Sequence, residues 1–219
     1  MLDNKPLEYT KLLPTHHDAV LEHLRNTFFA DEPLNKGTKL CQRGEGHPEL
    51  EKVVSDTLQD DISIVAVTKD GDIAGVVLNG WLHKGEVEES RQKLKNCKDE
   101  RFRTIFTLLY DENLKVDLFS QFGVEKMFEV RILSVDSRFR GQGIAKRLFE
   151  ESEKLARELN SKVIKADCTG LFSQKITASL NYTVCHEKYY DKYLNDQGER
   201  IIPVEQPHEK LQVKYKLLQ

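Results

Sequence analysis

The stretch "DSRFRGQGIAKRL", residues 136–148, joins two different hydrophobic patterns. Before it, "KMFEVRILSV" alternates apolar and polar residues, which predicts a β-strand. After it, apolar positions recur at helical spacing and predict a long helix whose buried face holds Ile144, Ala145, Leu148, Ser152, Leu155, Ala156 and Leu159. A further strand, "KVIKADC", follows. The three segments predict a strand–helix–strand unit of the length that a parallel crossover needs.

The turn between this strand and helix has the composition of an anion-binding site. Gly141 and Gly143 leave the backbone open to close approach, because a Cβ at either position would stand in the way. The first amides of a helix have no intrahelical partner, and the helix dipole is positive at that end. Arg138 and Arg140 add positive charge. The turn therefore predicts a site for a diphosphate group.

Two common phosphate-binding motifs do not fit the turn. A mononucleotide P-loop requires a second glycine at a fixed spacing, followed by lysine and a hydroxyl residue, and the stretch lacks both the glycine and the hydroxyl. A dinucleotide fingerprint requires a third glycine at position 146, where Lys146 stands. The pattern that remains is Arg138-x-x-Gly141-x-Gly143 after a β-strand.

This pattern resembles the acyl-coenzyme A motif of the GNAT superfamily of N-acetyltransferases. "FFADEPL" after the first predicted helix, with "CTGLFS" and "SLNYTV" after the later strand, is similar to the insect-type arylalkylamine N-acetyltransferases, and the likeness spans nearly the whole chain. The resemblance implies an α/β (α+β) fold with a mixed, mostly antiparallel sheet flanked by helices on both faces. It also implies acetyl transfer from acetyl-CoA to the primary amine of an arylalkylamine of the dopamine, tryptamine or serotonin type.

The resemblance implies a cofactor-binding surface at the strand end and the turn. The main chain of residues 133–135 is expected to pair with the pantetheine arm as an added strand, and an amide there to stabilise the oxyanion. The expected cofactor-binding residues are Leu133, Ser134, Val135, Arg138, Arg140, Gly141, Gln142, Gly143, Ile144, Ala145 and Ser173.

Acetyl transfer to an amine requires two proton movements. An amine with a pKa of about 10 must lose a proton before it attacks, and the departing thiolate must be stabilised or protonated. By resemblance, Glu32 is the base, whereas the sequence alone favours a solvated acid at a helix end. By resemblance, Thr169 and Ser173 supply hydroxyls, and their spacing predicts one face of a helix. Helix capping is the alternative for Thr169. Thr177 stands where many superfamily members have a tyrosine acid, so no tyrosine is assigned.

The remainder of the chain predicts one domain, residues 1–219. A helix is expected from Thr15 to about Ala30, a second over residues 50–58, and a β-hairpin around Asp70 and Gly71. Residues 83–121 are predicted to be a helical insertion, which would cover the groove that a peptide substrate needs. The tail segments "YTVCHEKYYDKYL" and "KLQVKYKLL" predict two more strands.

Composition limits the partners and the cofactors. A net charge of −3 gives no general attraction to nucleic acid, and no apolar run is long enough for a membrane span, so a cytoplasmic protein is expected. We expect no metal and a monomer or weak dimer, since the histidines lack zinc-ligand spacing. No Cys-x-x-Cys pair occurs among the cysteines, which are Cys41, Cys97, Cys168 and Cys185. Cys168 is interpreted as a buried thiol rather than an acetyl carrier.

Several alternatives stay open at this point. An acetyltransferase for polyamines or other small amines would share every motif above, and a non-catalytic acyl-CoA-binding module would keep the diphosphate turn without needing Glu32 or Ser173. The residues that line the amine pocket are not predicted, although aromatic candidates are Trp81, Tyr189, Tyr190 and Tyr193.

Overall fold

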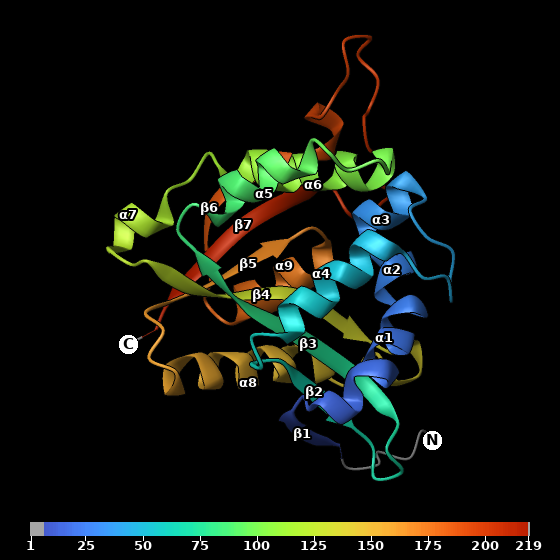
Figure 1. Ribbon diagram of the computed structural model, residues 1–219, viewed down its shortest axis with the longest axis vertical. Helices are drawn as coiled ribbons and strands as arrows, with labels where there is room; N and C mark the ends of the chain where they lie inside the picture. Colours follow the sequence, from blue (N-terminus) through green and yellow to red (C-terminus); the bar gives the residue numbers. More distant parts are fainter. Residues whose placement is uncertain (1–6, 219) are drawn as a thin grey trace.

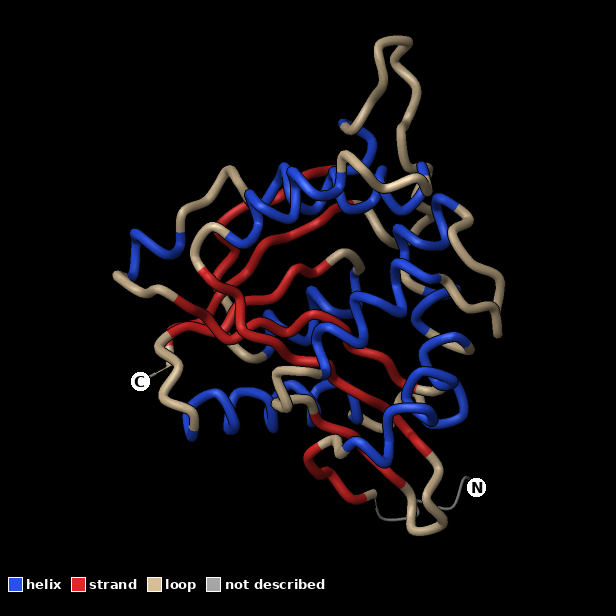
Figure 2. The backbone as a smooth tube through the Cα atoms, in the orientation of Figure 1, coloured by secondary structure: helices blue, strands red, loops and turns tan. Residues whose placement is uncertain are grey.

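The computed structural model describes residues 7–218, which build a seven-stranded sheet in the order β1-β2-β3-β4-β5-β7-β6. Figures 1 and 2 show the strands fanning across the middle of the molecule. The strands are β1 Glu8–Lys11, β2 Ile64–Val67, β3 Ile73–His83, β4 Lys126–Val135, β5 Val163–Cys168, β6 Thr183–Tyr189 and β7 Lys210–Leu217. Only β4 and β5 pair in parallel; the other neighbours are antiparallel. The predicted fold class and strand–helix–strand unit are therefore confirmed.

Helices cover both faces of the sheet. The α-helices are α1 His17–Arg25, α2 Phe28–Asp31, α3 Pro33–Thr38, α4 Pro48–Leu58, α5 Glu86–Leu94, α6 Glu100–Asn113, α7 Leu118–Phe122, α8 Ile144–Glu158 and α9 Leu171–Ser179. Short 3₁₀ turns lie at Pro14–His16, Ser137–Phe139 and Tyr190–Lys192. Buried residues of α8 pack on one face with those of β4 and β5. Helices α1 to α6 pack on the opposite face (Figure 1).

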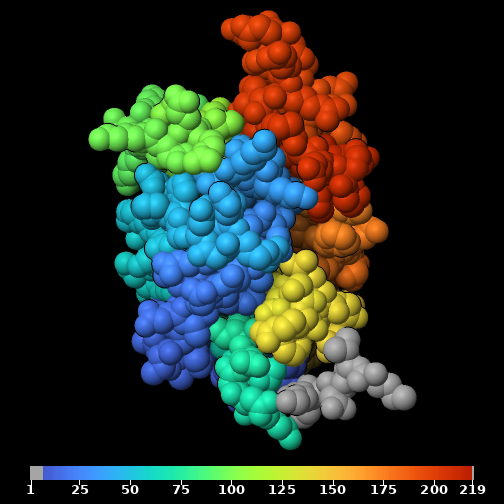
Figure 3. Space-filling model, turned by 90° about the vertical axis from the view of Figure 1, so that its right-hand side faces the viewer, coloured from blue at the N-terminus to red at the C-terminus, as the bar shows by residue number. Residues whose placement is uncertain are grey.

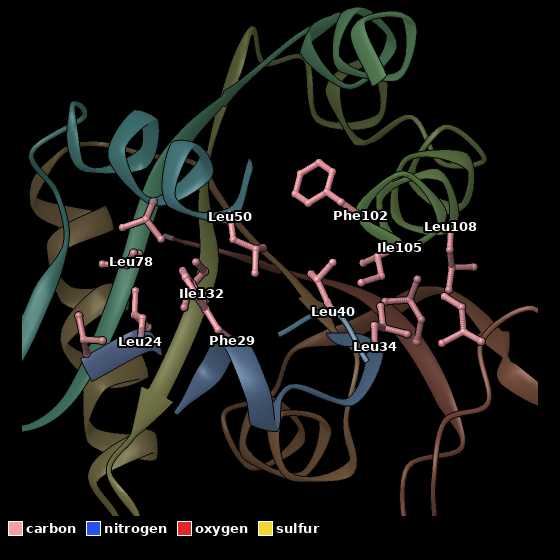
Figure 4. Packing of buried hydrophobic residues seen from close by; sticks show 14 of the residues in the cluster. Leu24, Phe29, Leu34, Leu40, Leu50, Leu78, Phe102, Ile105, Leu108 and Ile132 are labelled. Carbon is pink, nitrogen blue, oxygen red and sulfur yellow. The ribbon is translucent and has the colours of Figure 1, made fainter. Parts of the chain in front are cut away.

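The larger core lies between β3, β4 and the N-terminal helices. Figure 4 shows Leu78 and Ile132 of the sheet facing Leu24, Phe29 and Leu50, with α6 closing the far side. Leu24, Phe29 and Leu78 are fully buried. Burial of a leucine or phenylalanine of this kind stabilises a fold by about 1.5–3 kcal/mol, so this core fixes the N-terminal helices against β4.

The prediction of one continuous helix from Thr15 to about Ala30 is wrong, because the helix breaks at Asn26 and Thr27. Asn26 Nδ2 donates to Glu22 O at 3.0 Å, and Thr27 Oγ1 donates to His23 O at 2.6 Å. Side chains that compete for helical carbonyls in this way favour a break, and Thr27 leaves the helical region with φ −135°. Thr15 is not the cap either, since it lies inside a 3₁₀ turn. The break turns α2 toward the end of β4.

Most of the other expected elements are confirmed. The hairpin turns at Gly71, whose φ is +88°, and residues 83–121 are helical over α5, α6 and α7. Strand β1 and the short helix α3 were not predicted. Residues 1–6 and 219 of the expected single domain lie outside the described residues. Within residues 7–218, no helix combines the length and apolar composition that a membrane crossing requires.

Strands β4 and β5 are paired for only part of their length. The pairs are Phe128 with Ile164, Glu129 with Lys165 and Val130 with Ala166. At the next residue, Arg131, β4 carries a bulge in its pairing with β3, which bends a strand locally. Beyond it, β4 continues to Val135 without a partner on the β5 side. We call this opening between residues 131–135 of β4 and the end of β5 the splay.

Candidate active site

The splay leaves main-chain groups of β4 without a strand partner. The Asp136 amide donates to Ala74 O at 3.0 Å, so the groups of alternate residues along β4 point toward β3. Those of Leu133 and Val135 consequently point away from β3 and into the splay. They have the geometry to bind an extended ligand as an added strand.

The main chain of Ser134 was expected to pair with a ligand, but it pairs with β3 instead. Its main chain pairs with β3, opposite Val76, and its buried hydroxyl lies 3.0 Å from His23 Nε2 and 2.7 Å from Thr27 Oγ1. Burial lowers the pKa of His23 to about 4, so its ring is neutral near pH 7. Because Thr27 donates to His23 O, Thr27 Oγ1 accepts from Ser134 and Ser134 accepts from His23 Nε2–H. This cluster ties α1 to the end of β4.

The turn after β4 has the backbone conformation of an anion site. Gly141 and Gly143 have φ of +80° and +78°, and Gly143 is the N-cap of α8. Within residues 7–218, no acceptor meets the main-chain amides of residues 141–146. A Cβ built on either glycine would meet no atom within 4 Å, so the space in front of the turn is open. Open amides in such a turn form a cradle for a phosphate group.

The flanking arginines are already paired with acids. Arg138 binds Asp136 through Nη2 at 2.7 Å, and Arg140 Nη2 lies 2.9 Å from Asp31 Oδ2. Arg140 Nε also donates to Val135 O at 3.2 Å. Both arginine side chains stay more than half exposed. The Arg140 pair links the turn to the segment that carries the proposed base, and Figure 3 shows the turn (yellow) against the N-terminal helices (blue).

Three other predicted cofactor contacts differ in burial. The side chain of Ile144 is 2% exposed and belongs to the core between α8 and the sheet, so only its amide faces the open turn. Ala145 is half-buried, and Gln142 is exposed beside the glycines.

Glu32 is the N-cap of α3, and its Oε2 accepts from the Asn35 amide at 2.7 Å. Pro33 follows as the first helical residue, where its fixed φ is favourable. Oε1 of Glu32 is excluded from solvent and has no hydrogen-bond partner of good geometry among the described residues. Burial raises the pKa of Glu32, while the Thr169 side chain and the Asn35 amide act in the opposite direction. The carboxylate therefore has one satisfied oxygen and one orphaned one.

Thr169 and Ser173 do not share a helical face, because α9 begins only at Leu171 with Gly170 as N-cap. Thr169 precedes the helix, and its side chain reaches Glu32. Neither the helical prediction nor the capping alternative holds for Thr169. Ser173 lies in the first turn of α9 and donates to Gly170 O at 2.9 Å.

Three distant segments converge on the N-terminus of α9. A Cβ on Gly170 would stand 3.1 Å from Pro33 and 3.0 Å from His208 Nδ1, closer than ordinary contact. His208 Nδ1 accepts from the Leu171 amide at 3.1 Å, and Tyr190 Oη donates to Thr169 O at 2.6 Å. The absence of a side chain at Gly170 lets α3, α9 and segment 201–209 meet, and this meeting brings Glu32 beside Thr169.

Cys168 has the environment of a packing residue. It is 1% exposed, burial raises the pKa of its thiol, and its Sγ lies 3.5 Å from Thr177 Oγ1. A buried thiol with a raised pKa is a poor nucleophile. In the part of the chain that the structure describes, no group of three or more His, Cys, Asp or Glu side chains is placed to hold a metal ion.

Sequence reasoning missed three polar residues of this region: His23, Thr27 and His208. Tyr190 was an open aromatic candidate, and it is buried at 3% exposure beside Glu32 and Thr169. The histidines lie 111 and 37 residues from the groups that they contact, Ser134 and Leu171. The break at "RNT" was the one local signal, because Asn and Thr side chains disrupt helices.

The glycine turn, the open strand edge and the buried carboxylate agree with the acyl-transfer site that the resemblance predicted, and the family itself is shown by comparison with known proteins. The chain belongs to the acetyltransferase (GNAT) family, whose model matches residues 20–172. Among solved structures it is similar to arylalkylamine N-acetyltransferase 2 from Aedes aegypti, with 50% sequence identity, a TM-score of 0.95, and coverage of 97% of this chain and 99% of that chain.

More distant structures share the fold. A Drosophila melanogaster polyamine N-acetyltransferase, described as forming N-acetylagmatine, is 22% identical with a TM-score of 0.85, over 97% of this chain and 100% of that one. The C-terminal condensation domain of Ebony, in complex with β-alanyl-dopamine, is 15% identical with a TM-score of 0.69, over 97% and 99%. The expected superfamily is confirmed.

Proposed function

We propose that the protein transfers the acetyl group of acetyl-CoA to the primary amine of an arylalkylamine, by direct attack while both substrates are bound. The observation that carries the proposal is the orphaned, solvent-excluded Oε1 of Glu32 beside the splay. A carboxylate oxygen in such a place is under-satisfied until a donor reaches it. The similarity to an arylalkylamine N-acetyltransferase supports the choice of an aromatic amine.

The residues present fit an acyl-coenzyme A donor. The free amides at Gly141 and Gly143 suit its diphosphate, and the main chain of Leu133 and Val135 suits the amide-bearing pantetheine arm. Arg140 is near enough to exchange its partner Asp31 for a phosphate oxygen. An amide of β4 that points into the splay can also donate to the acetyl oxygen as negative charge develops there.

Glu32 provides the base for the acceptor. The amine arrives as a cation and gives one proton to Glu32, which its raised pKa makes a better acceptor than an ordinary glutamate. The amine nitrogen then bonds to the acetyl carbon as the carbon–sulfur bond breaks. The electron pair leaves on sulfur, and the nitrogen gives up a second proton to become the neutral amide. The Thr169 side chain lies against Glu32, so its hydroxyl can relay that second proton toward the thiolate, and Ser173 is the other hydroxyl proposed for this role.

The experiment that tests this function is thiol release from acetyl-CoA with aromatic monoamines, polyamines and buffer alone. We expect turnover with aromatic monoamines. Faster turnover with polyamines would make polyamines, and not arylalkylamines, the substrate class. Thermal stabilisation by coenzyme A without turnover on any amine would indicate a binding module instead.

The base is tested by Glu32→Gln, which keeps an oxygen to accept from the Asn35 amide and therefore preserves the cap. We expect kcat/KM to fall by about 100-fold or more, and the rise of rate with pH to disappear. Glu205→Gln, an exposed acid paired with Lys36 on the same helix, is the control and should keep wild-type kinetics. An unchanged pH profile in Glu32→Gln would exclude Glu32 as the base.

A further inference from the structure

Lys214 of β7 is a buried lysine without a carboxylate partner. Its residue is 2% exposed, and among residues 7–218 no acid lies within ion-pair distance of its ammonium group. Lys165, equally buried in β5, has both Glu129 and Asp167 at 2.8 Å. A buried cation normally needs such a partner, so Lys214 lies where the fold retains a positive charge at a cost.

The contacts of Lys214 all lead to α9. Its Nζ donates to Gln174 O at 3.1 Å and to Thr177 Oγ1 at 3.1 Å. Thr177 in turn donates to Ser173 O at 2.8 Å. Because the one hydroxyl proton of Thr177 is used on Ser173, its oxygen is an acceptor for both Lys214 and the Cys168 thiol. Lys214 thus holds the turn of α9 that carries Ser173.

This turn follows the end of β5, where the splay opens. Cys168 ends β5 at the splay, and Ser173 is close enough to lower the pKa of its thiol. The titratable groups that act on Lys214 are Cys168 from β5, which raises its pKa, and Lys210 on its own strand, which lowers it. Burial is the largest cause, and it leaves the pKa of Lys214 below the ordinary value.

We propose that Lys214 is a positioning residue for the proposed acetyl transfer, which orients the first turn of α9 and supplies the positive charge that stabilises the departing thiolate. The inference rests on the proposed function. A positive charge in a site shielded from water stabilises a nearby anion more strongly than the same charge would in solvent. Among residues 7–218 no carboxylate pairs with Lys214, so its charge is not neutralised by an acid.

The test measures the ionisation of the thiol of bound coenzyme A. The ultraviolet absorbance of the thiolate is recorded as pH is varied. Coenzyme A without its sulfur gives the background from the protein's own cysteines. We expect the midpoint in the wild type to lie below that of free coenzyme A. Lys214→Met should raise it by about one pH unit, since an opposite charge shifts a pKa by that order, whereas Lys214→Arg should keep it low.

Kinetics give a second measurement. In Lys214→Met, kcat should fall by about tenfold, because one electrostatic contribution to the leaving group is lost, while KM for acetyl-CoA stays unchanged. Lys216→Met is the matched control. It removes an ammonium group two residues along the same strand that pairs with Glu153 at 2.6 Å, and it should leave the midpoint at the wild-type value.

The outcomes separate the inference from the proposed function. A midpoint that is the same in wild type and Lys214→Met, with coenzyme A bound to both, overturns the role of Lys214. Should Lys214→Met not fold, Lys214→Gln removes the charge but keeps a side chain that can donate to α9; it should raise the midpoint in the same direction, and no change would again overturn the inference. Failure of coenzyme A to bind the wild type rejects the proposed function instead.

Discussion

Thr169 is a ligand of the proposed base rather than part of a helical pair. Its side chain lies against Glu32 and counteracts the effect of burial on the pKa of that carboxyl. Its carbonyl oxygen accepts from Tyr190 Oη at 2.6 Å, which fixes the loop before α9. A threonine hydroxyl at this position can therefore control at which pH Glu32 becomes charged.

We predict that Thr169→Val moves the pH dependence of kcat/KM upward. The Thr169 side chain favours the charged form of Glu32, so removal of its hydroxyl raises the pKa of Glu32 further above the ordinary value. The ascending side of the profile should consequently shift to higher pH. Thr169→Ser keeps the hydroxyl and is the control. A shift to lower pH in Thr169→Val would contradict this assignment.

At the scale of single residues, the sequence identified which residues belong to the candidate site better than it identified the surroundings of their side chains. Glu32 was named by its place in an Asp-Glu-Pro element, but the sequence alone favoured a solvated acid there. Its burial depends on Thr169 and Tyr190, which lie more than 130 residues away in the chain. A contact of that separation leaves no local pattern, so neither the orphaned Oε1 nor the carboxylate-free Lys214 could be predicted.

At the scale of elements, the glycine turn before α8 is the part of the site that local sequence determines most fully. The first residues of a helix always leave amides unpaired, and alternating glycines allow the left-handed conformations seen at Gly141 and Gly143. The helix before Glu32 was less predictable. Its apolar spacing continues through Asn26, so only the side-chain bonds of Asn26 and Thr27 end α1.

We predict that Gly143→Ala weakens coenzyme A binding by tenfold or more. The methyl group meets no protein atom, but it occupies the open side of the turn and resists a φ of +78°. Gly85→Ala is the matched control, because Gly85 is also a left-handed N-cap, with φ +86° and nothing within 4 Å of a Cβ. Both variants should lose about 1–2 kcal/mol of stability.

Calorimetric titration with coenzyme A distinguishes the two glycines. Only Gly143→Ala should show weaker binding, whereas thermal unfolding should change similarly in both variants. Equal loss of coenzyme A affinity in Gly85→Ala and Gly143→Ala would place the effect in general stability and not in the turn.

At the scale of the whole molecule, a buried ionic cluster holds the paired part of β4 and β5 together. Lys165 lies 2.8 Å from both Glu129 and Asp167, and Arg131 lies 3.0 Å from Glu129. Burial raises the pKa of Glu129, but Lys165 and Arg131 outweigh it, so the net pKa lies below the ordinary value. The pKa of Lys165 is raised, since its acids outweigh its burial.

We predict that Lys165→Met lowers the free energy of unfolding by about 3–5 kcal/mol, because it leaves Asp167 without its cation and Glu129 with Arg131 alone. Lys52→Met, which removes an exposed pair with Asp56, should cost about 1 kcal/mol or less. Denaturant unfolding at pH 7 measures both values. Equal losses in the two variants would contradict the prediction.

The same cluster sets a pH dependence of stability. A glutamate with a depressed pKa contributes stability that is present above its unfolded pKa, about 4.3, and is lost as pH falls toward its folded pKa. In Lys165→Met the pKa of Glu129 rises, so the difference in stability from wild type should narrow on acidification below about pH 5.

The sequence predicted the order of the strands in the sheet wherever neighbouring strands follow one another closely along the chain. The hairpin of β2 and β3 and the crossover from β4 to β5 were predicted from turn residues and periodicity. The insertion of β7 between β5 and β6 was not, because pairing across long loops depends on side-chain packing that no single segment contains.

The residues around the splay come from two different parts of the chain. The glycine turn and Glu32 lie within about the first 160 residues. The remaining quarter of the chain contains Thr169, Ser173 and the buried Lys214. A chain truncated between these parts would keep the glycine turn and Glu32, but it would lose Thr169 and the strand β5 against which the proposed donor site opens.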